Sequence, residues 1–381
     1  MPDWKVPLAD VRLTDEEVEA VASVYRAGWL SQGPRVAEFE REFASFTGSA
    51  QAIAVANGTA ALQLACALIG LGPGDEVVLP SLTFAATAAA IVHTGATPVF
   101  ADLRAVDSPW LSCNRARAAI GARTRAILNV SYAGHPGEAA ALAELALERG
   151  LTLIEDAAHA AGAWVGERHA GTLGRLGAFS FFANKNLAIG EGGMLVTDDP
   201  ALARRARLLR SHGLSSDTWA RHHGAEADYD VLEPGFNLRL DEPRAALGVL
   251  LLARLARDNE RRATLAAVYA DAFAAIEGVA PAITPEPGVT CAWHIFPVLL
   301  APGVDRAAFR ARLRDAGVQT SVHYPPLHLT TAFSLASPPS LPLTEDYALR
   351  TVTLPLFPHM SESHQQRVVA AASAALDHLT R

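Results

Sequence analysis

The middle of the chain alternates between short apolar segments and helical patterns, and this alternation limits the folds it can adopt. Helical patterns at residues 138–149 and 200–210 separate segments that read as β-strands. Strands that alternate with helices predict a mostly parallel sheet with helices on both faces, which is an α/β fold. The strands are expected at residues 77–79, 98–101, 126–130, 152–155, 178–182 and 194–197.

The length of the chain and the pattern after residue 250 indicate a second domain. At 381 residues the chain exceeds one ordinary hydrophobic core. A long helical pattern rich in Ala, Arg and Leu precedes expected strands at 293–300 and 320–324 and a helix at 306–315, and prolines mark a surface loop at 337–342. We therefore expect a large domain over residues 1–250, with an N-terminal arm, and a smaller C-terminal α+β domain over residues 251–381.

Charge and cysteine usage exclude several classes of partner. The net charge is −8, so a general affinity for nucleic acid or for membrane surfaces, which needs a basic face, is not expected. The three cysteines are scattered and form no CxxC motif, which is typical of a reducing compartment. No apolar signal core and no apolar run of membrane length occur. We expect a cytoplasmic protein.

Lysine is rare in this chain, and one of its two lysines stands in an unusual setting. Lys5 lies near the N-terminus, whereas Lys185 follows Ser-Phe-Phe-Ala-Asn and precedes a Gly-Glu-Gly-Gly run. Apart from these two, all of the 32 Lys and Arg residues are arginine. An arginine cannot lose its proton and attack a carbonyl, but a lysine amine can. Lys185 is therefore a candidate for Schiff-base chemistry.

A carboxylate 29 residues upstream complements this lysine. Asp156 ends the apolar segment Thr-Leu-Ile-Glu-Asp, and ligands of open α/β sheets bind at the carboxyl ends of strands. An Asp in this place can pair with the protonated ring nitrogen of pyridoxal phosphate (PLP), whose chemistry needs a cationic ring. Alone, such an Asp is more often a turn or helix cap. Together with Lys185 it points to PLP.

A third segment can hold the phosphate of such a cofactor. An expected strand at residues 52–55 is followed by Gly58 and Thr59, which open an apolar helix to about residue 68. Free N–H groups and the helix dipole favour an anion at a helix N-terminus. The turn is neither a Walker loop nor a dinucleotide fingerprint. No HExxH motif or cluster of metal-binding residue types occurs, so no metal is expected.

These residues belong to a set of motifs that resembles a known family. The chain is similar to the DegT/DnrJ/EryC1/StrS family of PLP-dependent sugar aminotransferases over nearly its whole length, and within it most to enzymes that aminate 4-keto nucleotide sugars, of the 4-amino-4-deoxy-L-arabinose type. The motifs lie at residues 23–40 (SVYRAGWLSQGPRVAEFE), 54–61 (AVANGTAA), 74–83 (GDEVVLPSLT), 155–163 (EDAAHAAGA), 180–193, 235–248 (GFNLRLDEPRAALG), 292–296 (AWHIF) and 323–328 (HYPPLH).

The resemblance implies the type I, aspartate aminotransferase-like fold and assigns cofactor roles. Lys185 would form the Schiff base and then move the proton, Asp156 would hold the ring nitrogen protonated, and His159 would lie near the phenolic oxygen of PLP. Phe84 would stack on the ring, although it could also be an ordinary core aromatic at a helix start. Ser180 would join Gly58 and Thr59 at the phosphate.

The resemblance also implies a homodimer and a substrate site. Asn237 would reach the cofactor phosphate of the partner subunit, so that active sites are shared; otherwise it is a turn-capping residue. For a nucleotide sugar, the resemblance indicates His323, Tyr324 and His328, together with Trp29. Without the resemblance, the HYPPLH residues would read as a structural turn and Trp29 as packing. Ser131 departs from the family, since relatives often have His there.

The reaction implied is transamination of a nucleotide-linked keto sugar, a 4-keto hexose or pentose, with L-glutamate as amino donor. An aminocyclitol (ketocyclitol) aminotransferase would use the same fold and lysine, so this alternative stays open. Related sugar dehydratases carry His in place of the Schiff-base lysine, which Lys185 argues against. A non-enzymatic regulator on the same scaffold is a further alternative, opposed by the intact pair of Asp156 and Lys185.

Overall fold

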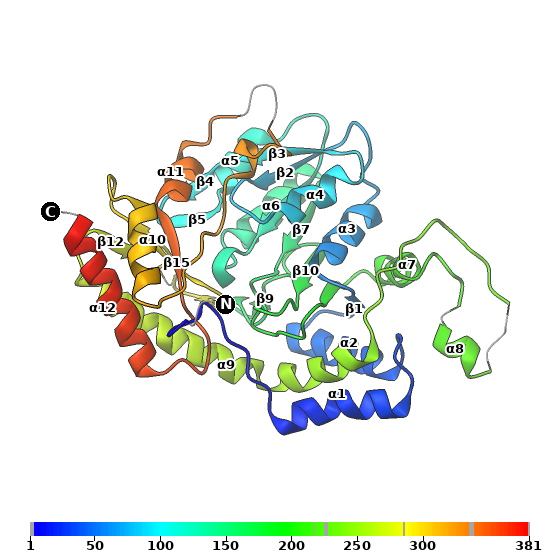
Figure 1. Ribbon diagram of the computed structural model, residues 1–381. Helices are drawn as coiled ribbons and strands as arrows, with labels where there is room; N and C mark the ends of the chain where they lie inside the picture. The colour runs from blue at the N-terminus through cyan, green and yellow to red at the C-terminus, as the bar shows by residue number, and fades with distance from the viewer. Residues whose placement is uncertain (1–3, 217, 225–227, 285, 335–338, 380–381) are drawn as a thin grey trace.

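The large body of the molecule is built on a seven-stranded sheet (Figure 1). The computed structural model describes residues 4–216, 218–224, 228–284, 286–334 and 339–379. Strands β10, β7, β6, β2 and β3 run parallel to one another, and β11 is antiparallel to both of its neighbours. The order across the sheet is β1 (Gln51–Val55), β11 (Gly193–Thr197), β10 (Leu176–Ser180), β7 (Thr152–Asp156), β6 (Thr124–Val130), β2 (Glu76–Pro80) and β3 (Thr97–Ala101). The predicted mostly parallel α/β sheet is confirmed.

Apolar residues on both faces of these strands explain why helices cover the sheet on both sides. Successive side chains of a strand point to opposite faces. Ile53 and Val55 of β1 join one buried cluster, whereas Ala52 and Ala54 join another. One face is covered by α3 (Gly58–Leu68), α4 (Ala85–Val92) and α7 (Pro200–Arg210). The other is covered by α2 (Pro34–Thr47), α5 (Cys113–Ala119), α6 (Ala139–Arg149) and the first half of α9 (Glu242–Ala274).

The smaller body packs around an antiparallel sheet and the second half of α9. The sheet has the order β12 (Val279–Pro281), β14 (Phe296–Leu300) and β15 (Thr351–Leu354). Helices α10 (Arg306–Asp315) and α12 (Glu362–Leu379) share its buried cluster, and Val6 of the N-terminal arm pairs with Val318. Residue 250 lies inside α9, so one continuous helix contributes to both bodies, and the domain boundary expected there stays a prediction.

The remaining elements are short. Helix α1 (Asp15–Ala27) packs on α9, and its N-cap Thr14 forms a capping box with Glu17. Strands β4 (Leu103–Ala105) and β5 (Ser108–Leu111) pair with each other, and a three-stranded sheet combines β13 (Val289–Thr290), β8 (Trp164–Val165) and β9 (Arg168–His169). Helix α8 (Thr218–His222), α11 (Pro342–Arg350) and the 3₁₀ turns η1 (Tyr132–Gly134) and η2 (Leu327–Leu329) complete the set.

Three expectations about the C-terminal part need correction. The strand expected at 293–300 begins at Phe296, because Trp293 has a φ of 47° and His294 bonds to the carbonyl of Ala133 outside the small sheet. The strand expected at 320–324 is not formed; one bridge joins Ser321 to Thr353. In the predicted loop at 337–342, residues 337 and 338 lie outside the described residues. Residues 339–341 form no helix or strand, as expected, and only Pro342 departs from the prediction because it begins α11, where its missing N–H costs nothing.

The strands β7 and β10 that lead into the site are held by unusually close packing. Glu155 points away from the face of Asp156, and its buried carboxylate accepts the N–H groups of Gly171 (2.9 Å) and Gly174 (2.7 Å). Gly177 of β10 lies against the same turn, where an added Cβ would stand 2.0 Å from the carbonyl oxygen of Gly171. No side chain fits at Gly177, because the nearby atom belongs to the backbone and cannot swing away.

We therefore expect Gly177→Ala to lower the free energy of unfolding by about 1–3 kcal/mol, as overpacking of a core does. The matched control is Gly72→Ala, since an added Cβ at Gly72 would meet nothing within 4 Å. Urea denaturation of both variants beside the parent protein measures the difference. Equal stability of the two variants would contradict the packing argument.

Candidate active site

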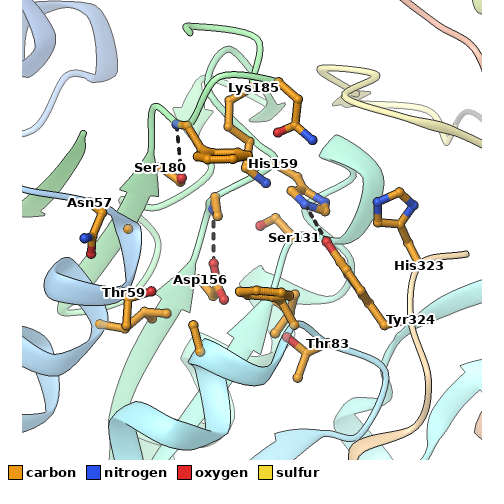
Figure 2. A pocket seen from close by; sticks show the side chains of 18 of the residues that line it. Asn57, Thr59, Thr83, Ser131, Asp156, His159, Ser180, Lys185, His323 and Tyr324 are labelled. Carbon is orange, nitrogen blue, oxygen red and sulfur yellow. Dashed lines mark hydrogen bonds between the residues drawn. The ribbon is translucent and has the colours of Figure 1, made fainter. Parts of the chain in front are cut away.

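A cavity of about 400 Å³ lies where the predicted site residues meet. It opens at the carboxyl ends of β6, β7 and β10, the edge at which ligands of open α/β sheets bind. Figure 2 shows the lining side chains converging from these strands, from the start of α3 and from the segment that carries Tyr324. The lining comprises residues 57–59, 62, 83, 84, 86, 130, 131, 156, 158, 159, 180, 182, 184, 185, 191, 323 and 324.

Asp156 is the last residue of β7 and forms part of this cavity. Its side chain is buried, and its two oxygens accept bonds from the Thr87 hydroxyl (2.7 Å) and the Ala158 N–H (3.1 Å). Burial raises the pKa of Asp156, while these two bonds and the charge of Lys185 act in the opposite direction. A cationic partner in the cavity would hold the carboxylate in its charged form.

Sequence reasoning missed the hydroxyl chain that holds this carboxylate. Thr87 donates to Asp156, and the Thr83 oxygen lies 2.7 Å from the Thr87 oxygen, so Thr83 must supply the hydrogen of that contact. The two threonines stand four residues apart across the start of α4, a spacing that puts them on one face of a helix. That spacing was the available signal, and it is a weak one because threonine pairs are common.

Lys185 lies in the loop after β10 and reaches the cavity from above Asp156 in the view of Figure 2. Loss of solvent lowers the pKa of its amine to about 8, and the negative charge of Asp156 opposes this shift. Its backbone N–H donates to the carbonyl of Phe182 at 2.8 Å, which closes the loop into a turn. The structure thus brings together the lysine and the aspartate that are 29 residues apart in sequence.

The start of α3 forms an anion cradle at one end of the cavity. Asn57 caps the helix by accepting the N–H of Ala60 at 2.8 Å, and the N–H groups of the two residues before Ala60 have no acceptor within the helix. Gly58 and Thr59 line the cavity together with Ser180, the last residue of β10. A Cβ at Gly58 would stand 2.7 Å from the Ser180 Cβ, so only glycine lets the helix approach the strand this closely.

His159 and Tyr324 form a linked pair in the cavity wall. His159 Nδ1 accepts the N–H of Ala133 (3.3 Å), and its Nε2 lies 3.0 Å from the Tyr324 hydroxyl (Figure 2). A backbone N–H can only donate, so a neutral His159 carries its hydrogen on Nε2 and donates it to Tyr324. Burial lowers the pKa of His159 well below its usual value and raises that of Tyr324. The hydrogen of the tyrosine is left for another acceptor.

Two further predicted residues line the cavity. Phe84 precedes α4 and exposes 59% of its surface, which excludes the core-aromatic alternative. His323 bonds through Nδ1 to the Thr353 hydroxyl (2.8 Å), and burial lowers the pKa of His323 to about 4. Their cofactor and substrate contacts stay predictions.

Three predicted residues do not line the cavity of their own chain. His328 is buried, with Nδ1 2.7 Å from the Ser81 hydroxyl and Nε2 3.3 Å from Glu345, so both ring nitrogens are engaged in holding η2 against the large body. Trp29 donates to the carbonyl of Gln32 and packs against Trp219 at 5.0 Å. Asn237 pairs with Ser211, and its predicted contact with a partner subunit stays a prediction.

Ser131 lines the cavity with a hydroxyl that has no hydrogen-bond partner in the described residues. Its backbone N–H donates to the carbonyl of Asp156 (3.0 Å), so it sits beside the aspartate at the ends of adjacent strands. Asn184 Oδ1 is a second unpartnered buried atom in this wall. Such orphaned polar atoms cost free energy unless a ligand engages them.

The residue types around the cavity fit PLP. The cradle of Gly58, Thr59 and Ser180 suits a phosphate, the buried Asp156 suits a protonated ring nitrogen, and the desolvated Lys185 suits an aldehyde. Among the described residues no group of three or more His, Cys, Asp or Glu side chains is arranged to hold a metal ion. No helix in the described ranges is long and apolar enough to cross a membrane.

Comparison with known proteins agrees with this assignment of the site. The family model of the DegT/DnrJ/EryC1/StrS aminotransferase family matches residues 11–373. The spore coat polysaccharide biosynthesis protein SpsC of Bacillus subtilis (strain 168) is 39% identical over 366 residues, which cover 93% of each chain. Among solved structures, the aminotransferase TlmJ of Streptoalloteichus hindustanus superimposes with a TM-score of 0.92 at 36% identity, with both chains fully covered.

A further structure bears on the cofactor. The PLP form of Spr1654 from Streptococcus pneumoniae has a TM-score of 0.91 at 25% identity and covers 98% of this chain and 99% of its own. The resemblance seen in the sequence motifs, the type I fold and the cofactor PLP are thereby confirmed. The chain belongs to the DegT/DnrJ/EryC1/StrS aminotransferase family and is a PLP-dependent aminotransferase.

Proposed function

We propose that this sugar aminotransferase transfers the amino group of L-glutamate to a nucleotide-linked keto sugar, a 4-keto hexose or pentose. The observation that carries the proposal is the desolvated Lys185 beside a buried Asp156 in one cavity with a phosphate cradle. The relative SpsC, described as a spore coat polysaccharide biosynthesis protein, supports a carbohydrate acceptor. The three unpaired cysteines support a reducing compartment, the cytoplasm.

Lys185 acts as the nucleophile and then as the proton carrier. With a pKa of about 8, about one amine in ten is neutral at pH 7, against about one in three thousand for an ordinary lysine. Only the neutral amine attacks a carbonyl or accepts a proton. Because the same side chain reaches the cavity in both roles, it is already placed for the proton transfer that follows.

The residues around Lys185 in the cavity wall stabilise charge and fix the orientation of the reacting groups. PLP, when bound, supplies the electron sink of the reaction. Asp156 would hold the ring nitrogen of PLP protonated, and Thr87 and Ala158 keep its carboxylate oriented. Tyr324, which receives a hydrogen from His159, directs its own hydrogen to an oxygen of the cofactor or the substrate. Phe84 covers the ring face.

A homodimer completes the site in this proposal. Gly58, Thr59 and Ser180 meet the phosphate from one protomer, and Asn237, which is outside the cavity of its own chain, reaches the phosphate in its partner. Lys185 is the only Lys or Arg among the residues that line the described cavity, and Glu191 adds negative charge. The nucleotide phosphates of the substrate are therefore expected at the rim of the cavity, towards the HYPPLH segment.

The substrate proposal is tested by pairing donors and acceptors with the purified enzyme. We expect L-glutamate to bleach the visible band of the PLP-loaded protein, and 4-keto nucleotide sugars to restore it. Ketocyclitols should restore it at least about tenfold more slowly, the scale of discrimination that pocket contacts provide. If ketocyclitols restore the band faster than 4-keto nucleotide sugars, the enzyme is an aminocyclitol aminotransferase and the proposed acceptor is wrong. A protein that binds no PLP would favour a non-enzymatic role.

Lys185→Arg keeps the positive charge but removes the titratable amine. We expect this variant to lose transamination by at least about a thousandfold while its circular dichroism stays that of the parent, because arginine keeps its proton at every accessible pH. Lys5→Arg is the matched control, since Lys5 is the other lysine of the chain, and it should keep full activity. Turnover of Lys185→Arg at the parent rate would refute the nucleophile assignment.

Shared sites predict complementation between inactive chains. Random mixing of Lys185→Ala with Asn237→Asp yields some dimers with one intact site, so roughly a quarter of the parental activity should return. Mixing Lys185→Ala with Asp156→Asn should restore none. Each site takes both Lys185 and Asp156 from a single protomer, so every site in the mixed dimer carries one of the two defects. The measurement is the activity after subunit exchange, with the heterodimers verified by native mass spectrometry. Equal recovery in the two mixtures, or none in verified heterodimers of the first, contradicts a contribution of Asn237 in trans.

A further inference from the structure

Two amide side chains connect helix α9 to the loop that carries Lys185. Asn186 immediately follows the lysine, and its Nδ2 lies 2.7 Å from the carbonyl of Ala292 and 2.8 Å from Oδ1 of Asn259. Asn259 lies on α9, and its Nδ2 lies 2.8 Å from the carbonyl of Ala161. Asn259 is buried, so these bonds are shielded from water.

The two carbonyl groups settle the orientation of both amides. A carbonyl can only accept, so the nitrogen of Asn259 must face Ala161 and the nitrogen of Asn186 must face Ala292. The oxygen of Asn259 then accepts from Asn186, and the oxygen of Asn186 is left for His294 Nδ1 at 3.1 Å. His294 therefore donates from Nδ1, and its neutral form has a lone pair on Nε2.

The backbone around Asn259 is shaped to admit its amide. Gly162 has a φ of 90°, and a Cβ there would stand 2.3 Å from Asn259 Nδ2. One turn further along α9, the buried guanidinium of Arg262 donates to the carbonyls of His294 (3.3 Å) and Leu356 (3.0 Å). Arg262 of α9 thus holds the backbone of His294, while Asn259 reaches the His294 side chain only through Asn186.

His294 in turn packs against His159 of the cavity wall. Its ring lies 4.2 Å from that of His159, centroid to centroid. Burial lowers the pKa of both rings well below the usual range, so neither competes with Lys185 for a proton. The titratable groups that interact electrostatically with Lys185 are Asp156, His159, His294 and His323.

We propose that Asn259 is a positioning residue for Lys185, acting through Asn186 to hold the lysine loop in the desolvated cavity and to orient His294 beside it. The inference rests on the proposed role of Lys185. Asn259 lies 74 residues from the lysine in sequence and is absent from the cavity lining, so its effect passes through the amide pair. Cutting the pair frees the loop and lets water reach the amine.

The two-lysine composition of the chain allows a direct test. Competitive acetylation of the full-length, cofactor-free protein with acetic anhydride, followed by mass spectrometry of the Lys5 and Lys185 peptides, yields a titration midpoint for each amine. Loss of solvent is the main cause that lowers the pKa of Lys185. If Asn259→Leu lets water reach the amine, the titration midpoint of Lys185 should rise by roughly half a pH unit or more. Lys5, which is exposed, serves as the internal reference.

The matched control is Gln365→Leu. Gln365 is also buried, and its Nε2 donates to the carbonyl of Leu265 on α9 at 2.8 Å, remote from the cavity lining. It should lower the thermal midpoint without moving the Lys185 titration. If Asn259→Leu does not fold by circular dichroism, Asn186→Ala interrupts the same pair and should give the same upward shift.

An unchanged Lys185 midpoint in a folded variant that interrupts the pair would overturn the proposal and leave Asn259 a structural residue. A shift of equal size in Gln365→Leu would also overturn it. The titration needs no turnover, so its failure is separate from failure of the aminotransferase assignment, which Lys185→Arg tests.

Discussion

The burial of one amine and one carboxylate at the same edge of the sheet is the constraint on which the rest of this site depends. Moving either group out of water favours its neutral form, and their mutual attraction compensates only in part. Asp156 is stabilised by Thr87 and Ala158, whereas Lys185 receives no hydrogen bond to its amine among the described residues. The aspartate is thereby prepared for a cationic partner and the lysine for the loss of a proton.

The close packing of the large body fixes the positions of these two groups relative to each other. Asp156 and Ser180 end adjacent parallel strands, and the Glu155 carboxylate on the opposite face ties the intervening turn to β7. Small residues make this possible: Gly177 meets backbone at a distance that excludes a Cβ, and Gly58 brings the start of α3 against Ser180. Two of the buried polar atoms that lack partners among the described residues, on Ser131 and Asn184, lie in the cavity wall, where a ligand can engage them.

The small body contributes two residues to the cavity wall. Tyr324 and His323 come from the segment before η2, and His328 holds that segment by bonding to Ser81 of the large body. The position of His328 gives the HYPPLH motif a structural component, since both nitrogens of this ring are already bonded. Helix α9 spans both bodies, so Asn259 and Arg262 can act on the cavity wall from behind it.

The sequence by itself determined the α/β class and the central strands of the large sheet, because short apolar segments that alternate with helical patterns are local signals. It also predicted roles for Lys185 and Asp156, and those roles stay predictions. It also indicated the helix N-terminus at Gly58, since capping chemistry is contained within a few residues. It could not show that Thr87 supports Asp156 or that Asn186 bonds Asn259, because these contacts join residues 69 and 73 positions apart. It predicted a strand at 320–324, but this segment forms only one bridge and turns His323 and Tyr324 into the cavity wall. Which side chains line the cavity, and which merely hold it, was decided by the tertiary structure, since burial and hydrogen-bond partners exist only once the chain has folded.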